Sequence, residues 1–223
     1  MRWSIVSDHK ITGEGSVRYC QIIGAGLLGI ILAAGCVSKG ERIDIKVPLA
    51  GGAPEKVVEK NSATIAIRPF EDNRTDRSNL GTRRHMWGGE SRFSSLPNGS
   101  LGDATAQAFA DYLNAKGWNA TVVESRGPVG ADIILSGSLD DVGVDVASSI
   151  GQTTLYARNR MVVFVKNLAD ESQIRETLAS TGTNQVFWFE PDDAQDLLNE
   201  LYNKNFEKFV KDTKLEGRVL KLR

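Results

Sequence analysis

Three long segments in the second half of the chain place the strongest constraint on its fold. Residues 131–146, 153–167 and 171–189 are rich in β-branched and aromatic residues, and apolar and polar residues alternate along the first of them. Only the short sequences ASSIGQ and LADES join them, which favours antiparallel pairing of neighbours. Because strands usually span about 5–6 residues, we expect bulges near Asp140–Asp141 and Gly182.

Two helical segments flank these strands. Residues 101–116 repeat apolar side chains at helical spacing, and Ser100 with Asp103 offers an N-terminal cap. Residues 191–212 begin with proline and two aspartates, which suit the positive end of a helix. ATIAIRPF and NATVVE predict further strands, and LEGRVLKLR a terminal edge strand. The order β-α-β-β-β-β-α predicts an α+β fold: an antiparallel sheet of about five strands with two helices packed on one face.

The N-terminal segment has the pattern of a signal peptide that ends at a cysteine. Its strictly apolar part, residues 22–34, would form a helix about 20 Å long. That is too short for a hydrocarbon core of about 30 Å, but it suits a secretory segment. The small residues Ala33, Ala34 and Gly35 then precede Cys36, as cleavage by a signal peptidase requires.

The segment from Leu32 to Cys36 resembles the lipobox of bacterial lipoproteins, with Ala33 where leucine is usual. The resemblance implies cleavage between Gly35 and Cys36 and a diacylglyceryl group on the cysteine sulfur, with no other cofactor. In enterobacterial lipoproteins an aspartate after the cysteine retains the protein in the inner membrane. Val37 stands there instead, which implies the outer membrane, on the side facing the periplasm. The alternative is an uncleaved anchor helix with an incidental cysteine.

These features divide the chain into three parts. Residues 1–35 are the predicted signal peptide, whose true start we place at Val17 because the preceding residues are polar and partly acidic. Residues 36–62 form the lipidated N-terminus and a flexible tether broken by prolines and glycines. The α+β globular domain covers residues 63–223.

Composition removes several classes of function. Lysine and arginine total 27 against 28 aspartate and glutamate residues, so no strong field attracts nucleic acid. The chain has two cysteines and two histidines, which leaves few metal ligands and general bases. The G-x-S-x-G and H-E-x-x-H motifs are both absent from the sequence. We therefore expect a protein that is not an enzyme and that holds no metal.

The polar loop at 71–99 carries the candidate binding residues. Arg74 is either an anion ligand aligned by Asp72 or, as we favour, part of an Asx turn and ion pair that closes a strand. The arginines that follow, with His85, could hold a phosphate or a sugar ring, although a solvated loop is the commoner reading. The possible binding residues are Asp72, Arg74, Arg83, Arg84, Trp87 and Arg92.

Two further clusters have a functional and a structural reading. Asp140, Asp141 and Asp145 resemble a cation site but lack the order of a calcium loop, so we interpret them as strand-edge charges. The VFWF sequence at 186–189 is interpreted as core packing under the second helix, with an exposed partner patch as the alternative.

The lipobox, the tether, IAIRPFEDNR, LNAKGW, ADIILSGSLDDV and the closing amphipathic helix together resemble the YajG-type envelope lipoproteins. Auxiliary lipoproteins of envelope transport systems are the second resemblance. Both imply a small α+β lipoprotein of the envelope. We therefore expect a non-enzymatic lipoprotein that binds an envelope protein partner. The alternative is a binder of a small ligand, such as a lipid, a glycan fragment or phosphate, through the 71–99 loop.

Palmitate labelling tests the predicted lipid anchor. Labelled palmitate should enter the protein in growing cells, because the lipobox directs acylation of Cys36. Cys36→Ser should abolish the labelling and leave a slower-migrating precursor on a denaturing gel. Labelling that survives this substitution would refute the assignment.

Overall fold

The computed structural model describes residues 63–93, 100–125 and 130–223, so the predicted signal peptide, Cys36 and the tether lie outside the described residues. Within these ranges the chain forms one mixed eight-stranded sheet, a two-stranded hairpin and two helices. No helix there is long and apolar enough to cross a bilayer. The elements are β1 (Thr64–Ile67), β2 (Glu71–Asp72), β3 (Thr82–Arg84), β4 (Glu90–Arg92), α2 (Leu101–Ala115), β5 (Asn119–Val122), β6 (Ile133–Ser149), β7 (Gln152–Asn167), β8 (Gln173–Val186), α3 (Pro191–Asp212), β9 (Thr213–Glu216) and β10 (Val219–Leu222).

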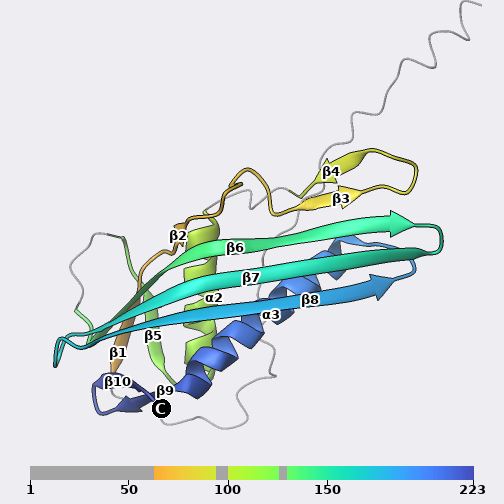
Figure 1. Ribbon diagram of the computed structural model, residues 1–223. Helices are drawn as coiled ribbons and strands as arrows, with labels where there is room; N and C mark the ends of the chain where they lie inside the picture. The colour runs from red at the N-terminus through yellow and green to blue at the C-terminus, as the bar shows by residue number, and fades with distance from the viewer. Residues whose placement is uncertain (1–62, 94–99, 126–129) are drawn as a thin grey trace, which may run out of the picture. The chain divides into compact units, whose positions relative to one another are not determined.

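Strand β6 is the spine of the sheet (Figure 1). One edge pairs with β7 in an antiparallel ladder from Ile133↔Asn167 to Ser149↔Gln152, and β8 continues the meander. The other edge pairs in turn with β1, β2 and β3, all parallel to β6, while β5 lies beyond β1 and β4 beyond β3. The prediction of an antiparallel sheet of about five strands is therefore wrong on both counts. Helix α2 crosses over between β1 and β5, and such a crossover leaves the two strands parallel.

The two predicted bulges had different outcomes. The register of the β6–β7 ladder shifts between Leu139 and Asp141, which confirms the first. The β7–β8 ladder runs without a shift past Gly182, so the second prediction is wrong. A Cβ at Gly182 would lie 3.0 Å from Leu197 Cδ1 and 3.2 Å from Leu201 Cδ2. The glycine therefore lets α3 approach the sheet closely.

Both helices begin where the sequence predicted and pack on the sheet. Helix α2 carries the expected capping box, in which Ser100 and Asp103 satisfy each other's backbone N–H groups. The Phe109 ring of α2 stacks on Phe206 of α3 with centroids 4.6 Å apart. The Tyr202 hydroxyl of α3 is hydrogen-bonded to Thr105, and burial raises the pKa of Tyr202 to about 12.

The C-terminal residues do not extend the main sheet. Strands β9 and β10 pair with each other as a separate hairpin, so the predicted edge strand is wrong. The hairpin is attached through buried Asn167, whose side-chain Nδ2 donates to the Leu220 carbonyl and whose Oδ1 accepts from the Leu220 N–H. These two bonds satisfy the buried side-chain amide of Asn167 and the backbone N–H and carbonyl of Leu220, which would otherwise lack partners.

A buried arginine ties β2 to the spine. Arg74 is only 6% exposed, and its Nε and Nη2 donate to both carboxylate oxygens of Asp72 at 2.9 and 2.8 Å. Its Nη1 donates to the carbonyl of Asn79 at 2.8 Å and to that of Val142 in β6 at 3.3 Å. The Asp72 carboxylate also accepts the Arg74 N–H, which forms an Asx turn. The Asp72–Arg74 pair therefore joins three segments of the chain.

The pair predicts a pH-dependent contribution to stability. Partial burial raises the pKa of the Asp72 carboxyl, but the hydrogen bonds and charge of Arg74 outweigh it and hold that pKa below its ordinary value. The stabilisation is therefore fully present above about pH 4 and is lost as the pH falls through the folded-state pKa.

Asp72→Ala should lower the free energy of unfolding by about 2–4 kcal/mol at pH 7, because it leaves the buried Arg74 charge without its partner. Asp111→Ala, at an exposed position of α2, should change it by less than about 0.5 kcal/mol. Chemical denaturation at several pH values measures both. A loss at Asp72 no larger than at Asp111 would contradict a structural role for the pair.

Candidate binding surface

Four large apolar side chains are exposed to solvent at one end of the sheet. Trp87 and Ile150 are each 87% exposed, Trp188 is 78% exposed and Phe187 is 76% exposed. Single exposed apolar residues are ordinary, but a group of this size at one place usually marks a contact site. We call Trp87, Ile150, Phe187 and Trp188 the aromatic end.

The aromatic end is assembled from three separate turns. Trp87 lies at the tip of the β3–β4 hairpin, Ile150 in the β6–β7 turn, and Phe187 and Trp188 in the link from β8 to α3. Gly88 has a φ of 88°, which a glycine adopts without strain, so the hairpin can reverse sharply beside Trp87. Strands β6, β7 and β8 are paired side by side up to two of these turns, and β3 pairs with the last part of β6, so all three turns lie next to one another (Figure 1).

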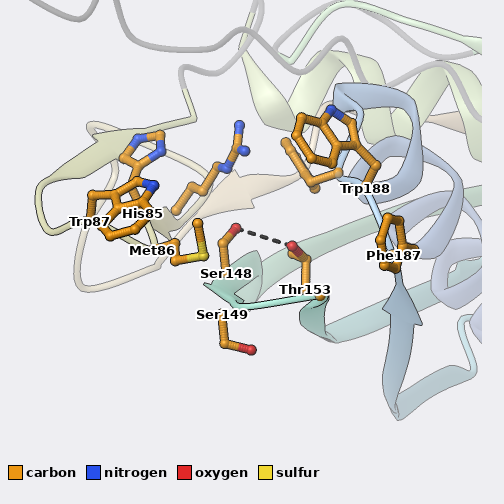
Figure 2. Close-up of a pocket in the computed structure, with 11 residues that line it drawn as sticks. His85, Met86, Trp87, Ser148, Ser149, Thr153, Phe187 and Trp188 are labelled. Atoms are coloured by element: carbon orange, nitrogen blue, oxygen red, sulfur yellow. Dashed lines mark hydrogen bonds between the residues drawn. The ribbon is translucent and has the colours of Figure 1, made fainter.

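A cleft of about 280 Å³ lies between the turns. In Figure 2 the His85 and Trp87 rings lie on one side of it and the Trp188 and Phe187 rings on the other. Between them, Thr153 donates a hydrogen bond to the Ser148 hydroxyl at 3.1 Å. The cleft is lined by Arg83, His85, Met86, Trp87, Ser148, Ser149, Gly151, Thr153, Phe187, Trp188 and Phe189.

The polar groups beside the cleft are partly engaged within the protein. The Arg83 guanidinium lies 4.2 Å from the centroid of the Phe189 ring, a cation–π distance. His85 Nε2 shares a hydrogen bond with Ser91 Oγ at 3.1 Å, and Ser91 is buried and does not line the cleft. The serine bonded to this histidine is therefore withheld from a bound molecule. Apolar stacking and a few hydrogen bonds are the chemistry that the cleft can offer.

The interpretation of VFWF as core packing is wrong for its two central residues. Strand β8 ends at Val186, so its alternation of sides stops just before Phe187 and Trp188, and both project into water. Phe189 enters the core, where it is 7% exposed and its ring centroid lies 6.1 Å from that of Phe93, and half-buried Val186 packs against the core. The period-two pattern does not continue into a link that must turn toward Pro191.

The structure separates the candidate residues of the 71–99 loop into two groups. Asp72 is in register with Leu139 of β6, whereas Arg83 is in register with Val146. Seven residues of strand separate these levels, or roughly 23 Å. Trp87 and Arg83 lie at the aromatic end, with exposed Arg84 and Arg92 on the same hairpin, while Asp72 and Arg74 bind each other beside the middle of β6.

The three aspartates of β6 contact arginines of β7. Asp141 accepts from Arg158 Nε at 2.8 Å and Asp145 from Arg158 Nη1 at 2.6 Å, while Asp140 lies 4.0 Å from Arg160. No cluster that could hold a metal ion occurs among the described residues. Ile150 was not among the residues predicted to bind, because the sequence does not show that its turn lies beside the other two turns of the aromatic end.

No model of a protein family matches this sequence, and no curated protein matches it. Similar solved structures include protein XCC0632 of Xanthomonas campestris, of the DUF330 family, with 10% identity and a TM-score of 0.49 over 76% of this chain and 92% of that one. A putative neuraminyllactose-binding hemagglutinin homologue of Helicobacter pylori has 13% identity and a TM-score of 0.41 over 76% and 91%. Lipoprotein GNA1162 of Neisseria meningitidis has 10% identity and a TM-score of 0.35 over 64% and 96%. Likenesses this low assign neither a family nor a function, and the resemblance to YajG-type lipoproteins stays a prediction.

The different exposure of Trp188 and Phe189 predicts that their replacement by alanine has very unequal effects on stability. Phe189→Ala should lower the free energy of unfolding by about 3–5 kcal/mol, because it empties a core position. Trp188→Ala should change it by less than about 0.5 kcal/mol, because the side chain has little packing to lose. Equal losses in chemical denaturation would show that Trp188 is packed and not displayed.

Proposed function

We propose that this chain is a lipid-anchored, non-enzymatic lipoprotein of the bacterial cell envelope whose body acts by binding through its aromatic end. The observation that carries the proposal is the exposure of four large apolar side chains on three adjacent turns. Keeping this surface in water is unfavourable, by roughly 25 cal/mol for each Å² of apolar area. A binding partner that covers this apolar surface would recover that free energy. The end of a sheet with only a structural role would have no reason to expose so much apolar surface.

The location rests on the sequence before Ala63. A secretory apolar segment that ends in Ala33, Ala34, Gly35 and Cys36 supports cleavage and lipidation. Val37 after the cysteine supports the outer membrane and its periplasmic face. The YajG-type lipoproteins and the auxiliary lipoproteins of transport systems are the two classes that fit a chain organised in this way.

Binding fits the cleft better than catalysis does. A hydrolytic site needs a nucleophile within reach of both a base and a substrate. His85 is bonded to a serine that is buried and outside the cleft lining, and none of the described residues that line the cleft is a carboxylate. A protein partner remains the expectation from the sequence, and tryptophan and arginine are among the side chains most enriched at the energetic centres of protein interfaces.

A small ligand is the second candidate, and the cleft favours it. About 280 Å³ between aromatic walls, with hydroxyls of Ser148 and Thr153 inside, is close to the size of a small-molecule site. Native mass spectrometry of the protein purified from cells tests this candidate. A bound small molecule that is lost on substitution of Trp87 would support it, and a bare protein mass would count against it.

Site-specific photocrosslinking in cells tests the main proposal. A photoreactive phenylalanine analogue at Trp188 should form adducts, because this side chain lies at the contact surface. The same analogue at Thr177, an exposed position on β8, serves as the control. Thr177 is nine residues from the end of β8, or roughly 30 Å along the strand.

Protein adducts are detected by gel and lipid adducts by mass spectrometry. Adducts at Trp188 that exceed those at Thr177 would support a binding surface at the aromatic end. Equal yields at the two positions would refute it, whatever the identity of the adducts.

A further inference from the structure

We propose that the aromatic end docks into the interface of a lipid bilayer, so that the body touches the membrane at a point separate from its lipid anchor. This inference rests on the proposed function and names the partner of the same surface. The occupant to which it commits is the boundary between lipid headgroups and acyl chains.

The shape of the aromatic end favours lipid over a folded protein. Its four side chains project from three separate turns and keep between 76% and 87% of their surface exposed. A protein partner would need a matching pocket for each projecting side chain, because interface cores are packed as densely as protein interiors. A fluid interface adapts to projecting side chains without preformed pockets. Tryptophan in particular favours the level of the headgroups, where its ring is apolar and its N–H finds a partner.

The charges around the aromatic end indicate that docking is driven by apolar contact. Arg84 and Arg92 on the hairpin are exposed and can reach lipid phosphates, but Glu90 lies between them along the chain. The start of α3 adds acidic side chains beside Trp188. With charges of both signs present, attraction to an anionic surface is weak, so salt should have little effect. The acidic residues at that helix start are Glu190, Asp192 and Asp193.

The chain is long enough for this arrangement. Ala63, where the described residues begin, precedes β1 at the end of the sheet where β6 starts, and the aromatic end lies where β6 finishes. The 17 residues of β6 span about 55 Å. The 26 residues from 37 to 62 can extend to at most roughly 90 Å. The tether therefore allows the far end of the body to meet the same membrane that holds Cys36.

Tryptophan fluorescence in vesicles tests the inference directly. The mature protein, purified in its cleaved and lipidated form, is reconstituted into vesicles of phosphatidylethanolamine and phosphatidylglycerol, with ordinary or brominated acyl chains. Flotation first establishes that the lipid anchor holds the protein on the vesicles. Beyond the predicted signal peptide the chain has three tryptophans: Trp87 and Trp188 at the aromatic end and Trp118 in the core. Bromine quenches only fluorophores that enter the lipid.

Brominated lipid should reduce the emission of the wild-type protein and shift it to shorter wavelength. The variant with Trp87→Phe and Trp188→Phe keeps only Trp118 and should show no quenching. Ile150→Glu combined with Phe187→Glu should abolish the quenching in a protein that still floats, because buried carboxylates are costly in lipid. High salt should leave the wild-type quenching unchanged.

Failure of the inference is distinguishable from failure of the proposed function. Wild-type protein that floats but is not quenched would overturn bilayer docking and leave the anchor intact. A blue shift without bromine quenching that grows with protein density would assign the surface to a second copy and overturn the inference. Protein adducts at Trp188 in cells, together with no quenching in vesicles, would assign the surface to a protein partner. Protein that does not float would refute the lipid anchor itself.

Discussion

The hydrogen-bond ladders along both edges of β6 are the constraint on which the rest of the body depends. On one edge β7 pairs along the whole strand, and on the other three short strands pair at successive levels. This arrangement separates the two ends of the body by the length of β6, about 55 Å. Ala63, the first described residue, lies at one end and the aromatic end lies at the other, so any function at the aromatic end operates far from the point where the predicted tether joins the body.

The short strands need their own means of staying on the spine. β2 has only two residues, too few to hold position by its ladder alone. The buried guanidinium of Arg74 supplies the rest by bonding to Asp72, to the loop at Asn79 and to Val142 of β6. Beyond this loop Gly81 passes so close to Val144 that an added Cβ would lie 1.8 Å from its carbonyl oxygen. The hairpin that carries Trp87 is thus held against β6 by contacts that lie outside the aromatic end.

Local signals in the sequence identified the helices and the long strands well and the strand pairing poorly. They missed β2, β3 and β4, because these short strands lie in the polar segment 71–99, which was predicted to be a loop. The helices, the capping box at Ser100 and the bulge after Leu139 each follow from residues a few positions apart. Parallel pairing of β1 with β5 and β6 joins segments more than fifty residues apart, and no periodicity records which strands become neighbours. The same limit affected the site. Trp87 was recognised as a candidate, but Ile150, Phe187 and Trp188 become one surface only because three turns meet at the end of the sheet.

The central claim is that the body touches the membrane through the end of the sheet remote from its tether. Beyond the predicted cleavage site Cys36 is the sole cysteine of the sequence, so single spin labels can be placed on the body without interference. The measurement is the collision accessibility of a nitroxide attached at Ile150→Cys when the protein is bound to vesicles. It is compared with the accessibility of a nitroxide attached at Thr181→Cys, an exposed position on β8. Our account predicts high accessibility to oxygen and low accessibility to a water-soluble nickel complex at Ile150→Cys, and the reverse at Thr181→Cys. Equal and high nickel accessibility at both positions would contradict it.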